Sequence, residues 1–313
     1  MKSRARHLSA CFVAVGLLLP ILAKEEKPPK HPSKPMLWKV EGKGLEVPSW
    51  LFGTIHLGKG RLSRLHPAAA KALDESDVLF TELPMDPAAQ IGMAGHHVRK
   101  DGRTLSDSIG PELSKQLDAE LAAISPALTS DALQGFKTWA VAVQVPMLAV
   151  QLEGAPALDT IVYRKAKAAG KETGALEKAA DQFDIFDGLS EAEQVGYLAE
   201  TLRMQEEARA KGGSPLGALV EAYLAGDDER AEAEMRRQFR FMAEGEHAEL
   251  GKKLMKQLLD DRNATMARDM AALLAADPGK SHFFAVGTGH YLGKGSIVEL
   301  LEKRGYEITR VAE

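Results

Sequence analysis

The sequence predicts an α/β protein in which a central mixed sheet is built from two similar βαβ halves, with large helical insertions between them. Three observations lead to this prediction. Short apolar segments typical of strands alternate with helical stretches near both ends of the region 36–313. The segments LFGTIHLGKG (51–60) and AVGTGHYLGKG (285–295) match with a single inserted residue. Much of the long region between them has apolar residues at three- and four-residue spacing, as helices do.

Strands are expected where short apolar segments are bounded by glycine, proline or charged residues. These segments are Leu37–Val40, Ser49–Phe52, Asp77–Leu83, Glu172–Glu177, His282–Val286 and Tyr306–Val311. The first two are expected to form a hairpin through Gly42 and Gly44. The segment Asp77–Leu83 is apolar enough to be buried on both faces, as strands of parallel sheets are.

The remaining chain is predicted to be mainly helical. The expected helical regions are 87–169, 180–276 and Ile297–Arg304, together with a helix that opens near Pro67. Pro111 and Pro126 are expected near helix starts. Trp139–Leu152 is the longest apolar segment outside the N-terminal region, and Pro146 interrupts it, which predicts a buried, kinked helix.

The first 23 residues have the pattern of a secretory signal peptide. Three basic residues precede the apolar segment Ala10–Leu22, and Ala23 offers a small residue at a plausible cleavage point. An exported protein, periplasmic or extracellular, is therefore expected. An uncleaved N-terminal anchor is the alternative, because Ile21 is a poor small residue for this position. Residues 24–35, rich in lysine and proline, are expected to form a linker to a single domain at 36–313.

Composition excludes several classes of function. The net charge of −4 provides no electrostatic footprint for nucleic acid. No apolar run reaches the length that spans a bilayer, so the mature chain is expected to have no transmembrane segment. Cys11, the only cysteine, lies in the leader, so the mature chain has no disulfide, thiol nucleophile or cysteine ligand. Motifs for zincins, serine hydrolases, P-loop proteins and dinucleotide-binding proteins are absent from the sequence.

His56 and His290 occupy the same position in the two matching segments. Gly53 and Gly287 allow each chain to turn tightly after its strand, which places both histidines at carboxyl ends of strands, where α/β sheets bind ligands. Both histidine side chains are expected to lie outside the packed interior. Glycine-rich turns look alike for steric reasons, but this alternative explains the glycines and not the histidines. A single histidine in such a turn would more often be a hydrogen-bonded structural residue.

Two carboxylates and one arginine are further candidates. Glu82 lies near the end of an apolar strand, where a charge needs a partner or a metal; a salt bridge to lysine or arginine is the alternative. Glu177 occupies a similar position, and helix capping is its alternative. Arg262, in the segment DDRNATMARDMAALL, has the geometry to bind a substrate carboxylate or carbonyl. Its alternative is an exposed helix charge.

Two histidines with one or two carboxylates suit a divalent metal such as zinc, manganese or cobalt. His56, His290 and Glu82 are the expected ligands. Such a site would leave one coordination position open for water, which becomes a usable nucleophile near neutral pH.

Six segments together resemble a known family. They are LWKVEG, LFGTIHLG, VLFTEL, ALDTIVYRKAKAAGKETGALEKAADQ, DRNATMARDM and FFAVGTGHYLGKGSIVELLEKRGYEI. Their order and context, over Leu37–Val311, resemble the TraB/GumN family, which includes pheromone-shutdown proteins and the TIKI Wnt-cleaving metalloproteases. The resemblance implies a metal-dependent hydrolase-like core, related in fold to the erythromycin-esterase and ChaN-type proteins.

Residue by residue, the resemblance places the family's two GxxH histidines at His56 and His290, its acidic positions at Glu82 and Glu177, and its Arg-Asn helix at Arg262. Two hypotheses follow. One is an exported metal-dependent hydrolase, chiefly a peptidase, acting on a peptide or other small-molecule substrate, with Glu82 or Glu177 as ligand or general base. The other is a non-catalytic binding protein on the same scaffold that sequesters a peptide, haem or another small ligand.

Overall fold

The computed structural model describes residues 31–32, 34–57, 60–152, 154, 156–214, 216–243 and 247–312 of the 313-residue chain. The expected signal peptide and most of the expected linker at 24–35 lie outside these residues. Within the described ranges, no helix is long and apolar enough to cross a membrane.

The described residues form one six-stranded mixed sheet. Its strands are β1 (Leu37–Glu41), β2 (Ser49–Thr54), β3 (Val78–Thr81), β4 (Glu172–Ala175), β5 (His282–Gly287) and β6 (Glu307–Arg310), in the order β4-β3-β5-β2-β1-β6. The first four strands of this order are parallel, whereas β1 is antiparallel to both of its neighbours. The predicted α/β class, mixed sheet and β1–β2 hairpin are confirmed.

The two matching segments leave the sheet side by side. They follow β2 and β5, which pair in parallel, and Thr54 lies opposite Gly287 in their register. The expectation that both strands run the same way in one sheet is therefore confirmed. An origin of the domain in two repeated halves stays a prediction.

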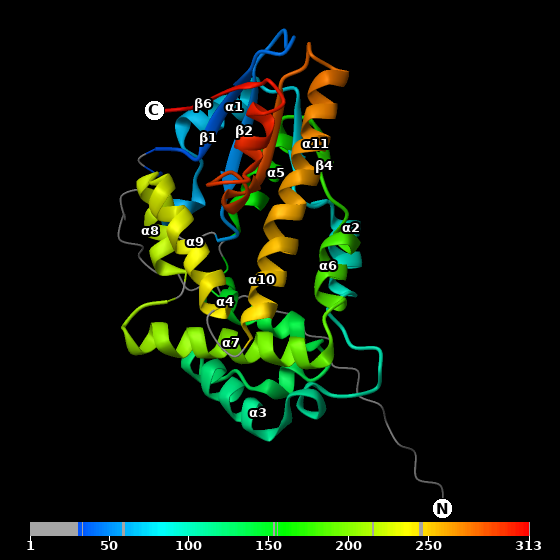
Figure 1. Ribbon diagram of the computed structural model, residues 1–313, viewed down its shortest axis with the longest axis vertical. Coiled ribbons are helices and arrows are strands. Elements are labelled where there is room, and N and C mark those ends of the chain that lie inside the picture. Colours follow the sequence, from blue (N-terminus) through cyan, green and yellow to red (C-terminus); the bar gives the residue numbers. More distant parts are fainter. Residues whose placement is uncertain are drawn as a thin grey trace, which may run out of the picture.

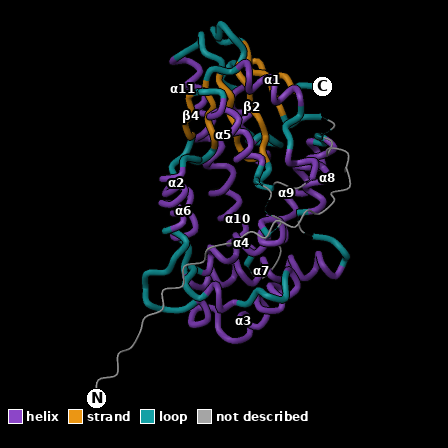
Figure 2. Tube along the Cα trace, turned by 180° about the vertical axis from the view of Figure 1, so that it is seen from behind, coloured by secondary structure: helices purple, strands orange, loops and turns teal. Residues whose placement is uncertain are grey.

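Helices surround the sheet and extend well beyond it. They are α1 (Pro67–Glu75), α2 (Pro87–Ala94), α3 (Leu105–Ile124), α4 (Thr138–Gln151), α5 (Leu158–Ala168), α6 (Ala179–Asp187), α7 (Glu191–Ala210), α8 (Gly217–Ala225), α9 (Asp228–Ala243), α10 (Ala248–Met255), α11 (Asp261–Ala276) and α12 (Ile297–Glu302). In Figure 1 the sheet lies at one end of the molecule and α3, α4 and α7 at the other, with α6, α9 and α10 between them. Figure 2 shows the same two ends from behind.

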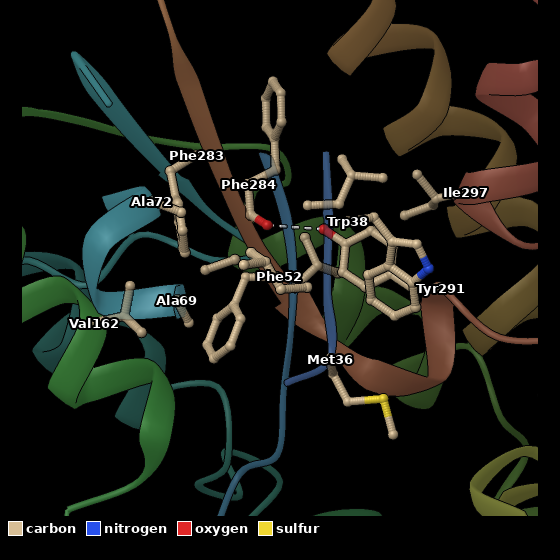
Figure 3. Packing of buried hydrophobic residues seen from close by; sticks show 14 of the residues in the cluster. Met36, Trp38, Phe52, Ala69, Ala72, Val162, Phe283, Phe284, Tyr291 and Ile297 are labelled. Carbon is tan, nitrogen blue, oxygen red and sulfur yellow. Dashed lines mark hydrogen bonds between the residues drawn. The ribbon is translucent and has the colours of Figure 1, made fainter. Parts of the chain in front are cut away.

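The largest core lies on both faces of the sheet. Figure 3 shows Ala69 of α1 and Val162 of α5 on the side of the sheet where Phe283 points, with Tyr291 and Ile297 on the opposite side. Phe283 is fully buried. Burying a side chain of this size contributes about 1.5–3 kcal/mol. Core packing on both faces thus fixes the strands whose carboxyl ends carry the candidate residues.

The helical end has a separate core formed by leucines and valines of α3, α4 and α7. Pro111 begins the second part of α3, after Gly110 turns the chain with φ 73°. The expected helix start at Pro126 is wrong, because α4 begins only at Thr138. Ser125 is extended, as residues before proline tend to be, and this ends α3 there.

Replacing Gly53 with alanine is expected to lower the free energy of unfolding by about 1–3 kcal/mol. A Cβ atom at Gly53 would lie 2.6 Å from Thr288 Oγ1 and 3.2 Å from Thr288 Cα, so the two adjoining turns would have to separate. Urea unfolding measures the change. Gly92→Ala in α2 is the control: a Cβ there meets no atom within 4 Å, and alanine is favoured in helices. Equal stability of both variants would contradict the close approach of the turns.

Candidate functional site

The candidate residues follow the carboxyl ends of the four parallel strands. Glu177 follows β4, Glu82 follows β3, His290 follows β5 and His56 follows β2. Because these strands are neighbours in the order β4-β3-β5-β2, their candidate residues lie along one edge of the sheet. Arg262 reaches this edge from the second position of α11. We call these five residues the edge cluster.

Three side chains of the edge cluster surround Gly287. A Cβ atom at Gly287 would lie 3.3 Å from Glu82 Oε2, 3.6 Å from His56 Nε2 and 3.7 Å from His290 Cδ2. The two histidines therefore approach each other at the carboxyl edge, with Glu82 beside them, as the sequence predicts. Glycine at position 287 leaves the space between them open.

His56 is held by an acidic partner from α5. Its Nδ1 lies 3.1 Å from Asp159 Oδ2, and Thr54 Oγ1 donates to Asp159 Oδ1 at 2.6 Å. The negative charge of Asp159 raises the pKa of His56 to about 9, although partial desolvation of the ring by its neighbours opposes this shift. The His56 side chain is 60% exposed, so water screens part of the attraction. With Nδ1 engaged, Nε2 faces the space at Gly287.

His290 has a neutral partner instead. The ring is 5% exposed, and its Nδ1 lies 2.6 Å from Asn263 Oδ1. Asn263 Nδ2 donates to the Gly295 carbonyl at 2.9 Å, which fixes the amide oxygen toward the ring. Nδ1 must therefore carry the proton and donate, which leaves the lone pair on Nε2. Burial lowers the pKa of His290 to about 3, and Arg262 adds to this effect, so the ring is neutral.

Glu82 is buried and accepts three hydrogen bonds. Its Oε1 accepts from Arg262 and from Gln182 Nε2, the latter at 3.2 Å, and its Oε2 accepts from Gly287 N–H at 3.0 Å. Burial alone would raise the pKa of Glu82. Arg262, the protonated His56 and the Gly287 N–H outweigh that effect and hold the pKa of Glu82 well below its ordinary value. Glu82 is therefore a carboxylate, and the salt bridge weighed as its alternative role is present.

Arg262 links the two glutamates. It lies 11% exposed, and its guanidinium donates to both oxygens of Glu177 at 2.7–3.0 Å as well as to Glu82. The alternative of an exposed helix charge is thus wrong for Arg262. The alternative role of Glu177, capping of a helix, is also wrong. The N-cap position of α6 is Lys178, and no side chain caps this helix. Burial raises the pKa of Glu177 despite this pairing.

Sequence reasoning missed Asp159 and assigned no role to Asn263 or Gln182. Asp159 lies in the first turn of α5, where an acidic residue is ordinarily explained by its favourable interaction with the helix dipole. The sequence therefore gives no sign that Asp159 contacts a histidine. Asn263 adjoins Arg262 but points to the other histidine turn. The expectation that His290 lies outside the packed interior is wrong, since the turn after β5 is covered by α9 and α11.

A cavity of about 470 Å³ borders the edge cluster. His56, Glu82 and Asp159 line it on the sheet side, and residues of α2, α4 and α6 line it on the helical side. Met93, His97 and Phe183 give the helical wall a mainly apolar and aromatic character. Its volume is in the range of small-molecule binding pockets.

The imidazole nitrogens and the carboxylate oxygens of the edge cluster are donor types that bind divalent metals. Both imidazoles have Nδ1 tied to an acceptor, the arrangement that leaves Nε2 for a metal once His56 has released its second ring proton, and Glu82 is an ionised oxygen donor. However, no three histidine, aspartate or glutamate side chains of the described residues form a preformed metal-binding group. Glu82 already accepts hydrogen bonds from Arg262, Gln182 and the Gly287 N–H, and a metal would compete with these donors for its oxygens. Its role as a metal ligand stays a prediction.

Comparison with known proteins identifies relatives over nearly all of the chain. A model of the TraB/PrgY/gumN family matches residues 36–310. The chain is 28% identical to metalloprotease TIKI1 of Danio rerio, over 90% of this chain and 64% of that protein. It is 28% identical to TIKI2 of Danio rerio, over 87% and 60%, and 25% identical to TIKI1 of Homo sapiens, over 91% and 63%.

The chain spans about three fifths of the length of these curated relatives. No solved structure matches it. The family match covers most of the chain and includes every residue of the edge cluster. The chain belongs to the TraB/PrgY/gumN family.

Proposed function

We propose that this protein is an exported, metal-dependent hydrolase that cleaves peptides at the edge cluster. The observation that carries the proposal is the convergence of His56, Glu82 and His290 on the open space at Gly287. The relatives named metalloprotease TIKI1 and TIKI2 support the reaction class. Export rests on the pattern of the first 23 residues.

His56 and His290 would hold the metal through Nε2, with Glu82 as an oxygen ligand or its charge partner. A bound divalent ion such as zinc, manganese or cobalt lowers the pKa of water and polarises a carbonyl group. Asp159 and Asn263 fix the orientation of the two rings by accepting hydrogen bonds from Nδ1.

The two glutamates have different roles in this proposal. Glu82 adjoins the space at Gly287 and stays ionised, so it can accept a proton or a hydrogen bond from a reacting group there. Arg262 links Glu177 to Glu82. We therefore assign Glu177 and Arg262 as positioning residues for Glu82. Arg262 is committed to these two carboxylates, so binding of a substrate carboxylate by Arg262 is not part of the proposal.

The substrate would lie in the cavity of about 470 Å³ that His56, Glu82 and Asp159 line. Its aromatic wall at His97 and Phe183 suits apolar peptide side chains, whereas the sheet side is charged. Burial of the peptide against this wall would hold a peptide bond near the edge cluster and exclude water other than the nucleophile.

One observation favours the second candidate, a binding protein without turnover. Glu82 already accepts three hydrogen bonds, from Arg262, Gln182 and the Gly287 N–H, and no preformed group of three metal donors exists among the described residues. A cavity of the same size would then bind a peptide, haem or another small ligand and leave it unchanged.

Metal removal separates the two candidates. We expect purified mature protein to contain a divalent metal by elemental analysis and to hydrolyse members of a peptide library. A chelator should reduce the rate to background, because the metal supplies the activated water, and added manganese, cobalt or zinc should restore it. Chelator-treated protein whose circular dichroism is unchanged excludes unfolding as the cause. Hydrolysis that survives removal of all measurable metal would refute the proposal, and absence of hydrolysis with every metal would favour the binding protein.

A further inference from the structure

A second, smaller cavity lies on another side of His56. Its volume is about 190 Å³, and it is also bordered by Gly287, Thr288 and His290. Its apolar walls are Leu219, Tyr223, Ala231, Met235, Leu259 and Leu292. These residues come from α8, α9, the π-helical segment Lys256–Asp260 before α11 and the segment after β5. This small cavity therefore touches both histidines of the edge cluster, but apart from His56 it shares no lining residue with the larger one.

The size of the small cavity suits one apolar side chain. An engineered apolar cavity of about 150 Å³ stays dry and binds benzene, whereas pockets for drug-sized ligands begin at about 300 Å³. At about 190 Å³, the small cavity has room for a side chain as large as leucine or phenylalanine, and not for a whole peptide. Its apolar walls carry no charge, and the basic groups that border it are the two histidines His56 and His290.

One polar group beside the small cavity lacks a partner. Thr288 is 6% exposed, and its hydroxyl oxygen makes no hydrogen bond with the described residues. Thr54, at the matching position of the other turn, donates to Asp159. A buried hydroxyl without a partner is destabilising unless water or a ligand binds it. The Thr288 oxygen is buried against Gly53, where a Cβ atom would lie 2.6 Å from it, so it does not open onto the small cavity and the apolar walls define what the cavity binds.

The two cavities flank His56, so a peptide that crosses the edge cluster can occupy both. Its main part would lie in the larger cavity, while one side chain next to the edge cluster enters the small cavity.

We propose that the small cavity is a specificity subsite, which takes one apolar side chain of the substrate adjacent to the cleaved bond. This inference rests on the proposed peptidase function. It adds what that function leaves open, namely which substrates are preferred and which residues select them.

Two probes test the subsite without any turnover: N-acetyl-leucine methylamide and N-acetylglycine methylamide, titrated by ligand-observed NMR. Both present the same backbone, but only the first has a side chain. We expect the leucine probe to bind the wild-type protein about tenfold more tightly or better, from burial of its side chain. Equal affinity for the two probes would overturn the proposal.

Variants of lining residues test whether the apolar walls of the small cavity select the side chain. Leu219→Trp fills the cavity and should bring the leucine probe to within about twofold of the glycine probe. Thr288→Val keeps the shape of the side chain and removes a hydroxyl that does not open onto the cavity, so both affinities should stay within about twofold of wild type. Leu259→Ala enlarges the cavity and should shift the preference toward a tryptophan probe. Leu273→Ala, a half-buried leucine of α11 outside both cavities, is the control and should change neither affinity.

Hydrolysis of a peptide library then separates this inference from the proposed function. Metal-dependent cleavage with no side-chain preference near the cleaved bond would refute the subsite and leave the peptidase intact. Probe binding that follows the three variants, without cleavage in any metal, would keep the subsite and refute the peptidase. A preference of the leucine probe that persists in Leu219→Trp, provided that this variant melts like wild type, would also overturn the subsite.

Discussion

Replacing Arg262 with leucine is expected to lower the free energy of unfolding by about 3–5 kcal/mol, the range for removing one partner of a buried ion pair. The guanidinium is buried between Glu82 and Glu177 and hydrogen-bonds both carboxylates. Leucine would leave two buried negative charges side by side without a cation. Urea unfolding near neutral pH measures the loss. Activity should fall as well, because Glu82 loses its fixed orientation.

The pH dependence of Arg262→Leu has a defined sign. In the wild-type protein the pKa of Glu82 is held well below its ordinary value, so this stabilisation is complete above about pH 4.5 and declines as the pH falls further. In the variant, acid protonates the two uncompensated carboxylates and relieves their repulsion. The difference in stability should therefore be largest near neutral pH and shrink on acidification.

Two matched variants identify the cause. Arg262→Leu combined with Glu177→Gln removes one of the two charges and should recover part of the lost stability. Arg268→Leu lies on the same helix but affects an exposed pair with Asp269, so its effect should stay within about 0.5 kcal/mol. If Arg262→Leu is as stable as Arg268→Leu, the buried ion pair is not what holds α11 to the strand edge.

The positions of the candidate residues were predictable because they depend on local rules. A strand followed by a glycine turn places the next large side chain at the carboxyl edge, and this holds for His56 and His290. A carboxylate near the end of an apolar strand must find a partner, and Glu82 does so. These inferences need only the order of strands and turns along the chain.

The partners of these residues were not predictable, because they come from distant helices. Arg262 lies 85 residues from Glu177 and 180 from Glu82, so their contact depends on how α11 packs against the sheet. Asp159 reaches His56 from the start of α5, 103 residues away. Helical spacing indicates which face of such a helix is apolar. It does not indicate which strand end that face will cover.

The two matching turns show how far packing alters the same motif. His56 lies beside a carboxylate in an exposed position and has a raised pKa, whereas His290 lies beside an amide in a buried position and has a lowered one. The threonines of the two turns differ in the same way, since Thr54 binds Asp159 and Thr288 has no described partner. The motif fixes the backbone and the position of each histidine, and the covering helix determines its protonation.

His56→Ala and His290→Ala are both expected to reduce metal-dependent hydrolysis by several orders of magnitude, because each removes one of very few ligands. For comparison, loss of an outer-shell partner alone typically costs about 10-fold to 100-fold in metal affinity or activity. Their effects on stability should differ. His56 is largely exposed, and its replacement should change the free energy of unfolding by about 1 kcal/mol or less. His290 is buried against Asn263, so its loss leaves an amide oxygen unpaired and should lower stability by about 2–3 kcal/mol.

Melting curves, metal content and peptide hydrolysis measured together separate ligand loss from unfolding. His282→Ala is the matched control for His290→Ala: this histidine is buried as well, in the first residue of β5, at the opposite end of the strand from the edge cluster. It should lose stability and retain metal and activity. His247 lies outside the lining of both cavities, so His247→Ala is the control for His56→Ala and should retain metal and activity. If both cluster variants retain metal and full hydrolysis, His56 and His290 are not the ligands, and binding without turnover becomes the better explanation of the fold.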